Sequence, residues 1–125
     1  MALLTSLKDL DHPTQIFKIG QKITEEGSPG KKVYILKKGI VAVSINKKVI
    51  ATALDPGSIF GEIASVCGCN HSATVTAVEE SEFFVIDDFI TYLHQHPEDS
   101  LSVIKSLCER IVLLNDNEVS RTITL

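Results

Sequence analysis

Short runs of apolar residues dominate the middle of this chain. Between about residues 16 and 86, β-branched and aromatic residues recur in runs such as Val33–Leu36, Ile40–Ile45 and Phe83–Ile86. Turn-forming sequences separate the runs: Gly27-Ser28-Pro29-Gly30, Asn46-Lys47-Lys48 and Asp55-Pro56-Gly57. Many short strands joined by such turns predict a mainly β domain, an antiparallel β-roll, jelly roll or sandwich.

Helical periodicity appears at both ends of the chain. Residues 1–15 carry leucines at helical spacing and predict a short N-terminal helix. Residues 87–120 predict two C-terminal helices. Asp87 is the expected N-cap of the first, which ends near His96, and Pro97 starts the second, long helix. An apolar stripe on the long helix alternates steps of three and four, as a coiled-coil seam does: Ile104, Leu107, Ile111 and Leu114.

Length and charge narrow the class of protein. A chain of 125 residues fits one domain, and we expect residues 1–125 to form it. The net charge of −4 and the lack of a basic cluster larger than a lysine pair argue against nucleic-acid binding. No apolar run approaches a membrane span. Three cysteines without a framework spacing favour a reduced, cytoplasmic protein.

The segment from Phe60 to Val75 is the most informative for function. It predicts a strand end, a glycine turn, one turn of helix, a polar loop and a new strand. Gly61 allows a ligand to approach the backbone, and the helix that follows directs N–H groups toward an anion. Glu62 adds a carboxylate that can accept from a sugar hydroxyl, while His71 and Ser72 return to the same place. The segment therefore predicts an anion pocket.

The order and spacing of these elements resemble the cyclic-nucleotide-binding domain family over nearly the whole chain. Phe17–Gly27 resembles the family's opening β-turn-β, and Val33–Val43 resembles its next hairpin. Leu54–Ala64 is similar to the entry to its phosphate-binding cassette, and Ser72–Val75 to the exit strand. The resemblance implies a β-roll flanked by helices, as in the bacterial catabolite-activator-like (Crp/Fnr-like) regulators. It also implies a non-catalytic signalling module with cAMP or cGMP as ligand and no prosthetic group.

The resemblance also implies roles for particular residues. Gly61 would allow close approach, Glu62 would hold the ribose 2′-hydroxyl, and Ser72 would bind the phosphate. Near the base, Leu114 and Asn115 fall at the positions that contact it in the bacterial regulators. The long helix would form a homodimer. The full set of candidate ligand-binding residues is Phe60, Gly61, Glu62, Ile63, Ala64, His71, Ser72, Ala73, Leu114 and Asn115.

Two departures from the family pattern matter for the ligand. The cassette loop of the family usually ends in proline-arginine, whereas this chain has Asn70-His71. Histidine, whose ordinary pKa is near ~6.5, cannot form the permanently charged bidentate contact that arginine gives. We therefore expect ligand binding that is weakened and pH-dependent, or a fold that has lost its ligand and serves in protein interaction or dimerisation. The second departure is that no DNA-binding helix-turn-helix follows before Leu125.

The sequence offers two alternative kinds of site. Cys67, Cys69 and His71 alternate along the loop and could converge on a metal, although a structural zinc site needs a fourth ligand. A cupin-like metal enzyme, which also uses a jelly roll, would need a His-x-His pair on the strands, and none is present. No nucleophile elbow or paired carboxylates stand out. We therefore expect no catalytic residue and no metal.

Overall fold

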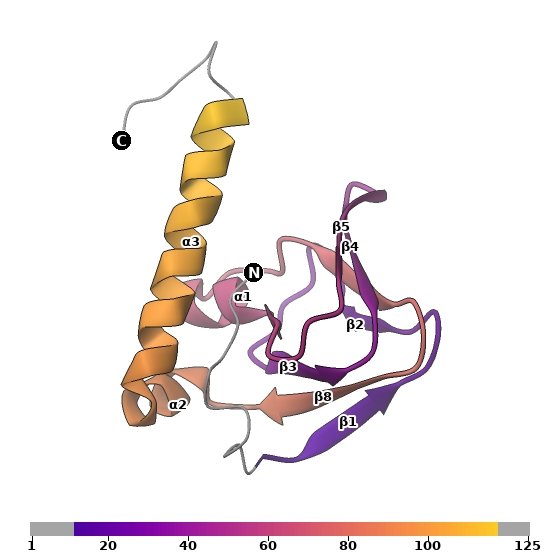
Figure 1. Cartoon of the computed structure of the whole chain (residues 1–125), viewed down its shortest axis with the longest axis horizontal. Coiled ribbons are helices and arrows are strands. Elements are labelled where there is room, and N and C mark those ends of the chain that lie inside the picture. Colours follow the sequence, from indigo (N-terminus) through magenta and orange to yellow (C-terminus); the bar gives the residue numbers. More distant parts are fainter. Residues whose placement is uncertain (1–11, 118–125) are drawn as a thin grey trace.

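In the described part of the chain, antiparallel strands and three helices form the fold. The computed structural model describes residues 12–117, but not the side chains of Ser106 or of residues 109–117. The strands and helices follow this order along the chain: β1 Thr14–Phe17, β2 Lys22–Thr24, β3 Val33–Lys38, β4 Val41–Ile45, β5 Lys48–Ala53, β6 Ile59–Phe60, α1 Glu62–Cys67, β7 Thr74–Ala77, β8 Ser81–Ile86, α2 Phe89–Gln95 and α3 Pro97–Asn117. The helices lie to one side of the roll (Figure 1).

The strands form two four-stranded antiparallel sheets. One has the order β1-β8-β3-β6 and the other β2-β7-β4-β5. The hairpin from β4 to β5 turns through Asn46 and Lys47, which both have positive φ angles (52° and 65°). Positive φ at both central residues matches the twist of a two-residue hairpin. The predicted β-roll is confirmed.

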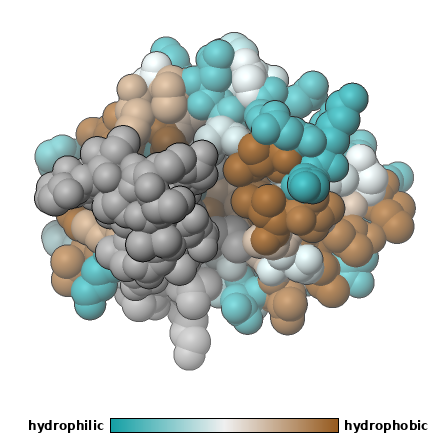
Figure 2. All heavy atoms as spheres, turned by 90° about the horizontal axis from the view of Figure 1, so that it is seen from above, coloured by the Kyte–Doolittle hydropathy of each residue, from teal (hydrophilic) through white to brown (hydrophobic). Residues whose placement is uncertain are grey.

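Strands β3 and β8 separate two hydrophobic clusters. On one face, Val33 and Ile35 pack with Phe89 and Tyr92 of α2 and Val103 of α3. On the other face, Leu36 and Phe83 belong to the cluster that fills the roll. Both faces of β3 are thus buried, which explains the continuous apolar run in its sequence. Some large apolar side chains remain on the surface as well (Figure 2).

Some boundaries differ from those that the sequence predicts. Thr14 and Gln15 lie in β1, paired with β8, instead of ending the N-terminal helix. The rest of that predicted helix falls on residues 1–11, which lie outside the described part of the chain. Asp88, not Asp87, is the N-cap of α2: its carboxylate accepts from Thr91 N–H at 3.1 Å and from the Thr91 hydroxyl at 2.7 Å. Only a side chain at position 88 stands three residues before that N–H group.

Helix α3 begins at Pro97, as the sequence predicts, with Glu98 and Asp99 in its first turn. Asp99 is fully buried, and its carboxylate accepts from the Tyr92 hydroxyl at 2.6 Å. From the predicted stripe, Leu107 packs against the cluster between sheet and helices, whereas Ile104 is 56% exposed. The side chains of Ile111 and Leu114 lie outside the described residues.

Candidate functional site

The turn between β6 and α1 depends on Gly61. Gly61 has φ 85° and ψ 2°, a left-handed conformation, and is the N-cap of α1. A Cβ at this position would lie 2.8 Å from the carbonyl oxygen of Lys32. Both the backbone angle and the close neighbour therefore require glycine here.

The N–H groups at the start of α1 lie directly after this glycine. The first hydrogen bond within the helix runs from Ser65 N–H to the carbonyl of Gly61, at 3.1 Å. The N–H groups of Ile63 and Ala64 precede it and therefore have no acceptor within the helix. Glu62 begins the helix with its side chain only 4% exposed. These N–H groups are therefore candidate donors to an anion.

The cassette loop returns to the β2–β3 loop through paired backbone hydrogen bonds. Gly68 ends α1 with a positive φ of 66°. His71 N–H donates to the carbonyl of Ser28 at 2.9 Å, and Gly27 N–H donates to the carbonyl of His71, also at 2.9 Å. These two bonds fix the backbone of His71 beside a segment that is distant in sequence.

The ring of His71 lies between two glycines. A Cβ built on Gly30 would overlap His71 Nε2, and one built on Gly61 would be 3.5 Å from His71 Cε1. The imidazole is therefore close to the start of α1, as the sequence predicts for a residue of an anion site. Gly30, which the sequence suggested only as part of a turn, makes room for the ring.

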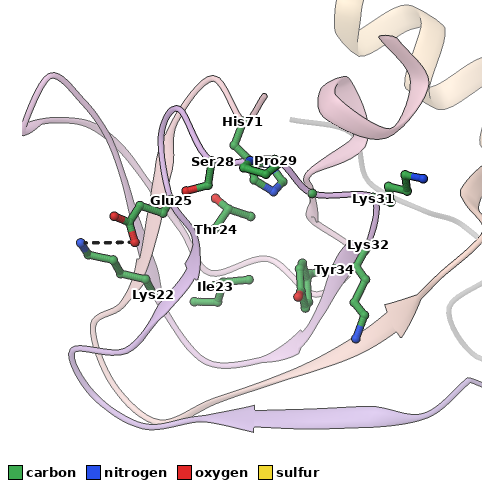
Figure 3. A pocket seen from close by; sticks show the side chains of 11 residues that line it. Lys22, Ile23, Thr24, Glu25, Ser28, Pro29, Lys31, Lys32, Tyr34 and His71 are labelled. Carbon is green, nitrogen blue, oxygen red and sulfur yellow. Dashed lines mark ion pairs between the residues drawn. The ribbon is translucent and has the colours of Figure 1, made fainter. Parts of the chain in front are cut away.

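A surface pocket of about 470 Å³ opens beside His71 (Figure 3). Its walls come mainly from β2, the β2–β3 loop and the beginning of β3. The residues that line it are Lys22, Ile23, Thr24, Glu25, Ser28, Pro29, Gly30, Lys31, Lys32, Tyr34 and His71. Among the candidate residues whose side chains the structure describes, only His71 lines this pocket. None of the other residues that line the pocket was predicted as a ligand contact. The sequence signal that could have indicated them is the lysines on either side of the Gly27–Gly30 turn: Lys22, Lys31 and Lys32.

The pocket has more positive than negative groups at its rim, in a chain whose net charge is −4. Lys22 Nζ is 3.9 Å from a carboxylate oxygen of Glu25, and Lys32 Nζ is 4.0 Å from Asp87 Oδ1. Burial, and secondly the charge of Asp87, raise the pKa of the Tyr34 hydroxyl, so this group stays protonated at neutral pH. A neutral phenol and nearby lysines suit an anionic ligand with polar groups.

The remaining candidate residues are spread around the cassette. Phe60 is buried in the roll, with its ring 6.1 Å from that of Phe83. Ser72 and Ala73 precede β7 instead of opening it, because the ladder with β4 ends at the pair Ser44 and Thr74. Ser72 is exposed, and the carbonyl of Ala73 accepts from the Thr24 hydroxyl at 3.1 Å. The side chains of Leu114 and Asn115 lie outside the described residues.

The described part of the chain, residues 12–117, has no metal-ligand cluster and no membrane-spanning helix. Among its described side chains, no three His, Cys, Asp or Glu come together as a metal-binding group. Cys67, Cys69 and His71 thus do not assemble the site that their spacing suggested. Over the same range, each helix is too short or too polar to cross a lipid bilayer.

The β-roll carries a left-handed glycine that begins a short helix, and a returning loop whose His71 lines a neighbouring pocket with a basic rim. This arrangement defines a class of small-ligand-binding domains. The family model for the cyclic nucleotide-binding domain matches residues 14–96. The chain belongs to this family, and the resemblance noted in its sequence is confirmed.

Similar proteins place the same domain in several contexts. The chain is 32% identical over 119 residues to cyclic nucleotide-gated channel alpha-2 of Homo sapiens, covering 85% of this chain and 18% of the channel. It is 32% identical over 97 residues to glutaminase 2 of Bradyrhizobium diazoefficiens, covering 75% of this chain and 15% of that protein. The chain therefore spans less than a fifth of the length of either relative.

The fold is also that of a solved bacterial regulator. The structure of the Thermus thermophilus catabolite activator protein superposes with a TM-score of 0.79 at 22% identity, over 94% of this chain and 59% of that one. The likeness shows that the two proteins share one fold, a β-roll with adjacent helices.

Proposed function

We propose that this chain is a regulatory module that binds a cyclic nucleotide, cAMP or cGMP, in the cassette of residues 60–75. The observation that carries the proposal is the geometry around Gly61. A left-handed glycine is followed by the first N–H groups of α1, with the His71 ring 3.5 Å from a Cβ built on that glycine. In this family the same segment holds the cyclic phosphate.

The proposal assigns a role to each part of the cassette. The cyclic phosphate lies against the N–H groups of Ile63 and Ala64, next to His71 and Ser72. Glu62 accepts a hydrogen bond from the ribose 2′-hydroxyl. The purine extends toward the pocket wall and α3, where Leu114 and Asn115 are the proposed contacts.

The signal would pass through α3. A ligand that contacts both the roll and α3 stabilises the docked position of the helix and shifts a pre-existing equilibrium toward it. We infer a non-catalytic, cytoplasmic module that dimerises through α3. Two exposed apolar side chains on that helix, Leu101 and Ile104, support the dimer.

Calorimetry with cAMP and cGMP at pH 6 and pH 8 tests the role of His71. A bound phosphodiester anion favours the protonated imidazole, so we expect tighter binding at pH 6. Arginine provides a permanent charge and two donors, so His71→Arg should tighten binding about tenfold at pH 8 and remove most of the pH dependence. If neither the pH nor the substitution changes the affinity, His71 is not a phosphate contact.

A second candidate function is a ligand-free interaction module on the same fold. One observation favours it: the imidazole of His71 lies between Gly30 and Gly61, directly beside the proposed phosphate position. In that case millimolar cAMP and cGMP should give no heat at either pH. Analytical ultracentrifugation would then show whether the chain self-associates without ligand.

A further inference from the structure

Lys32 lies where the segment before β3 passes the beginning of α1. Its carbonyl oxygen is 2.8 Å from the position that a Cβ on Gly61 would take, and the Cα of Val33 is 3.8 Å from the same position. The Lys32 side chain also lines the pocket that His71 lines. Lys32 is therefore beside the proposed phosphate position, on a chain segment distant in sequence from the cassette.

The alternation of β3 places Lys32 on the pocket side. Val33 points to the cluster shared with α2 and α3, whereas Tyr34 packs against the cluster inside the roll. Successive side chains of an extended segment point to opposite faces, so Lys32, directly before β3, is expected on the side of Tyr34. Lys31 lines the same pocket. In Figure 3 the Lys32 side chain runs beside Tyr34, while that of Lys31 points in another direction.

The ion pair that Lys32 makes is easily exchanged. Its Nζ lies 4.0 Å from Asp87 Oδ1, and the two side chains are 58% and 78% exposed. Such exposed pairs contribute little to stability, because water screens them and both side chains lose freedom. A lysine ammonium on its flexible four-carbon stem can rotate to a new acceptor. A phosphodiester anion, held at the same time by helix N–H groups, offers the ammonium a second charge-assisted acceptor in place of the solvated Asp87 carboxylate.

We propose that Lys32 supplies the permanent positive charge that this cassette lacks with His71 in place of arginine. In the empty pocket the Lys32 ammonium pairs with Asp87. When the cyclic nucleotide enters, the ammonium leaves Asp87 and binds the ligand phosphate together with His71. This inference rests on the proposed function and adds to it an anion contact from outside the cassette.

Titration of cAMP into Lys32→Ala tests the contact, with Lys38→Ala as the matched control. Lys38 is also an exposed lysine in an ion pair, 3.8 Å from Glu82, but it is not among the residues that line the pocket. At low salt we expect Lys32→Ala to bind about tenfold more weakly than the unchanged chain, and Lys38→Ala to stay within about twofold. Added salt should weaken the unchanged chain more than Lys32→Ala, because one screened contact is missing from the variant.

Asp87→Asn separates an exchange of partners from a general effect of charge. If Asp87 holds Lys32 away from the ligand, Asp87→Asn should tighten cAMP binding about threefold in the unchanged chain but not in the Lys32→Ala background. Unfolding curves of all variants check that the fold is retained.

Three outcomes would overturn the inference: Lys32→Ala binds as well as the unchanged chain, Lys31→Ala is weakened in its place, or Asp87→Asn has the same effect in both backgrounds. In each of these the unchanged chain still binds, so the proposed function stands. If the unchanged chain binds neither cAMP nor cGMP, the proposed function fails, and the inference fails with it.

Discussion

Gly61→Ala is expected to weaken cyclic-nucleotide binding by at least about a hundredfold and to lower the free energy of unfolding by about 2–4 kcal/mol. Two effects add at this position. Alanine is disfavoured at a φ of 85°, and its Cβ would lie 2.8 Å from the carbonyl oxygen of Lys32. The close contact is relieved only if the turn moves. Such a movement displaces the N–H groups of Ile63 and Ala64, which follow the turn and are the proposed phosphate donors. Isothermal calorimetry and urea unfolding measure the two quantities.

Gly20→Ala is the matched control for this substitution. Gly20 has nearly the same φ, 84°, but a Cβ there would meet no atom within 4 Å. It should therefore show the backbone penalty alone, about 1–2 kcal/mol, and bind ligand normally. If Gly61→Ala behaves like Gly20→Ala in both measurements, the close approach at Gly61 has no role in the site.

The largest effect on stability alone is expected for Phe83→Ala, which should lower the free energy of unfolding by about 3–5 kcal/mol. The Phe83 ring is fully buried and makes edge-to-face contacts with the rings of Phe17, Tyr34 and Phe60, at centroid distances of 5.6, 6.3 and 6.1 Å. Removal of the ring leaves a cavity next to Tyr34, which lines the pocket, and next to Phe60 in β6, the strand that precedes Gly61. Chemical denaturation measures the loss.

Phe83→Leu is the conservative partner of that variant. Leucine refills most of the volume, so we expect a loss of less than about half that of alanine. A domain of ordinary stability, about 5–15 kcal/mol, should keep its fold in the leucine variant. If Phe83→Ala unfolds at the same urea concentration as the unchanged chain, the aromatic cluster is not the core of the roll.

Local sequence signals were sufficient for most of the fold. The apolar run Val33–Leu36 indicates a strand buried on both faces, and β3 lies between the two clusters. Asn46-Lys47 marks the hairpin turn that the structure places there. The errors are at boundaries. The long-range pairing with β8 extends β1 back to Thr14, and the local hydrogen bonds from Thr91, three residues further on, select Asp88 over Asp87.

The candidate site could be predicted only in part. The glycine turn, α1 and the return of His71 all follow from residues 60–75, because these residues are contiguous in sequence. The pocket wall with Lys32 and Tyr34 is some forty residues earlier and reaches His71 through the backbone bonds of Gly27 and Ser28. No spacing rule in one sequence shows such a pairing between distant loops. The same holds for Gly30, whose importance depends on the ring that lies against it.

The most direct test of the central claim is an NMR titration of the unchanged chain with cAMP, cGMP and, as a control, linear 5′-AMP. If the cassette binds cyclic nucleotides, the amide signals of Gly61, Ile63 and Ala64 and the ring signals of His71 should shift and saturate together with at least one of the cyclic ligands. Linear 5′-AMP should shift them less at the same concentration. Unchanged signals at millimolar cAMP and cGMP, or equal shifts with all three nucleotides, would contradict a cyclic-nucleotide-binding function for this chain.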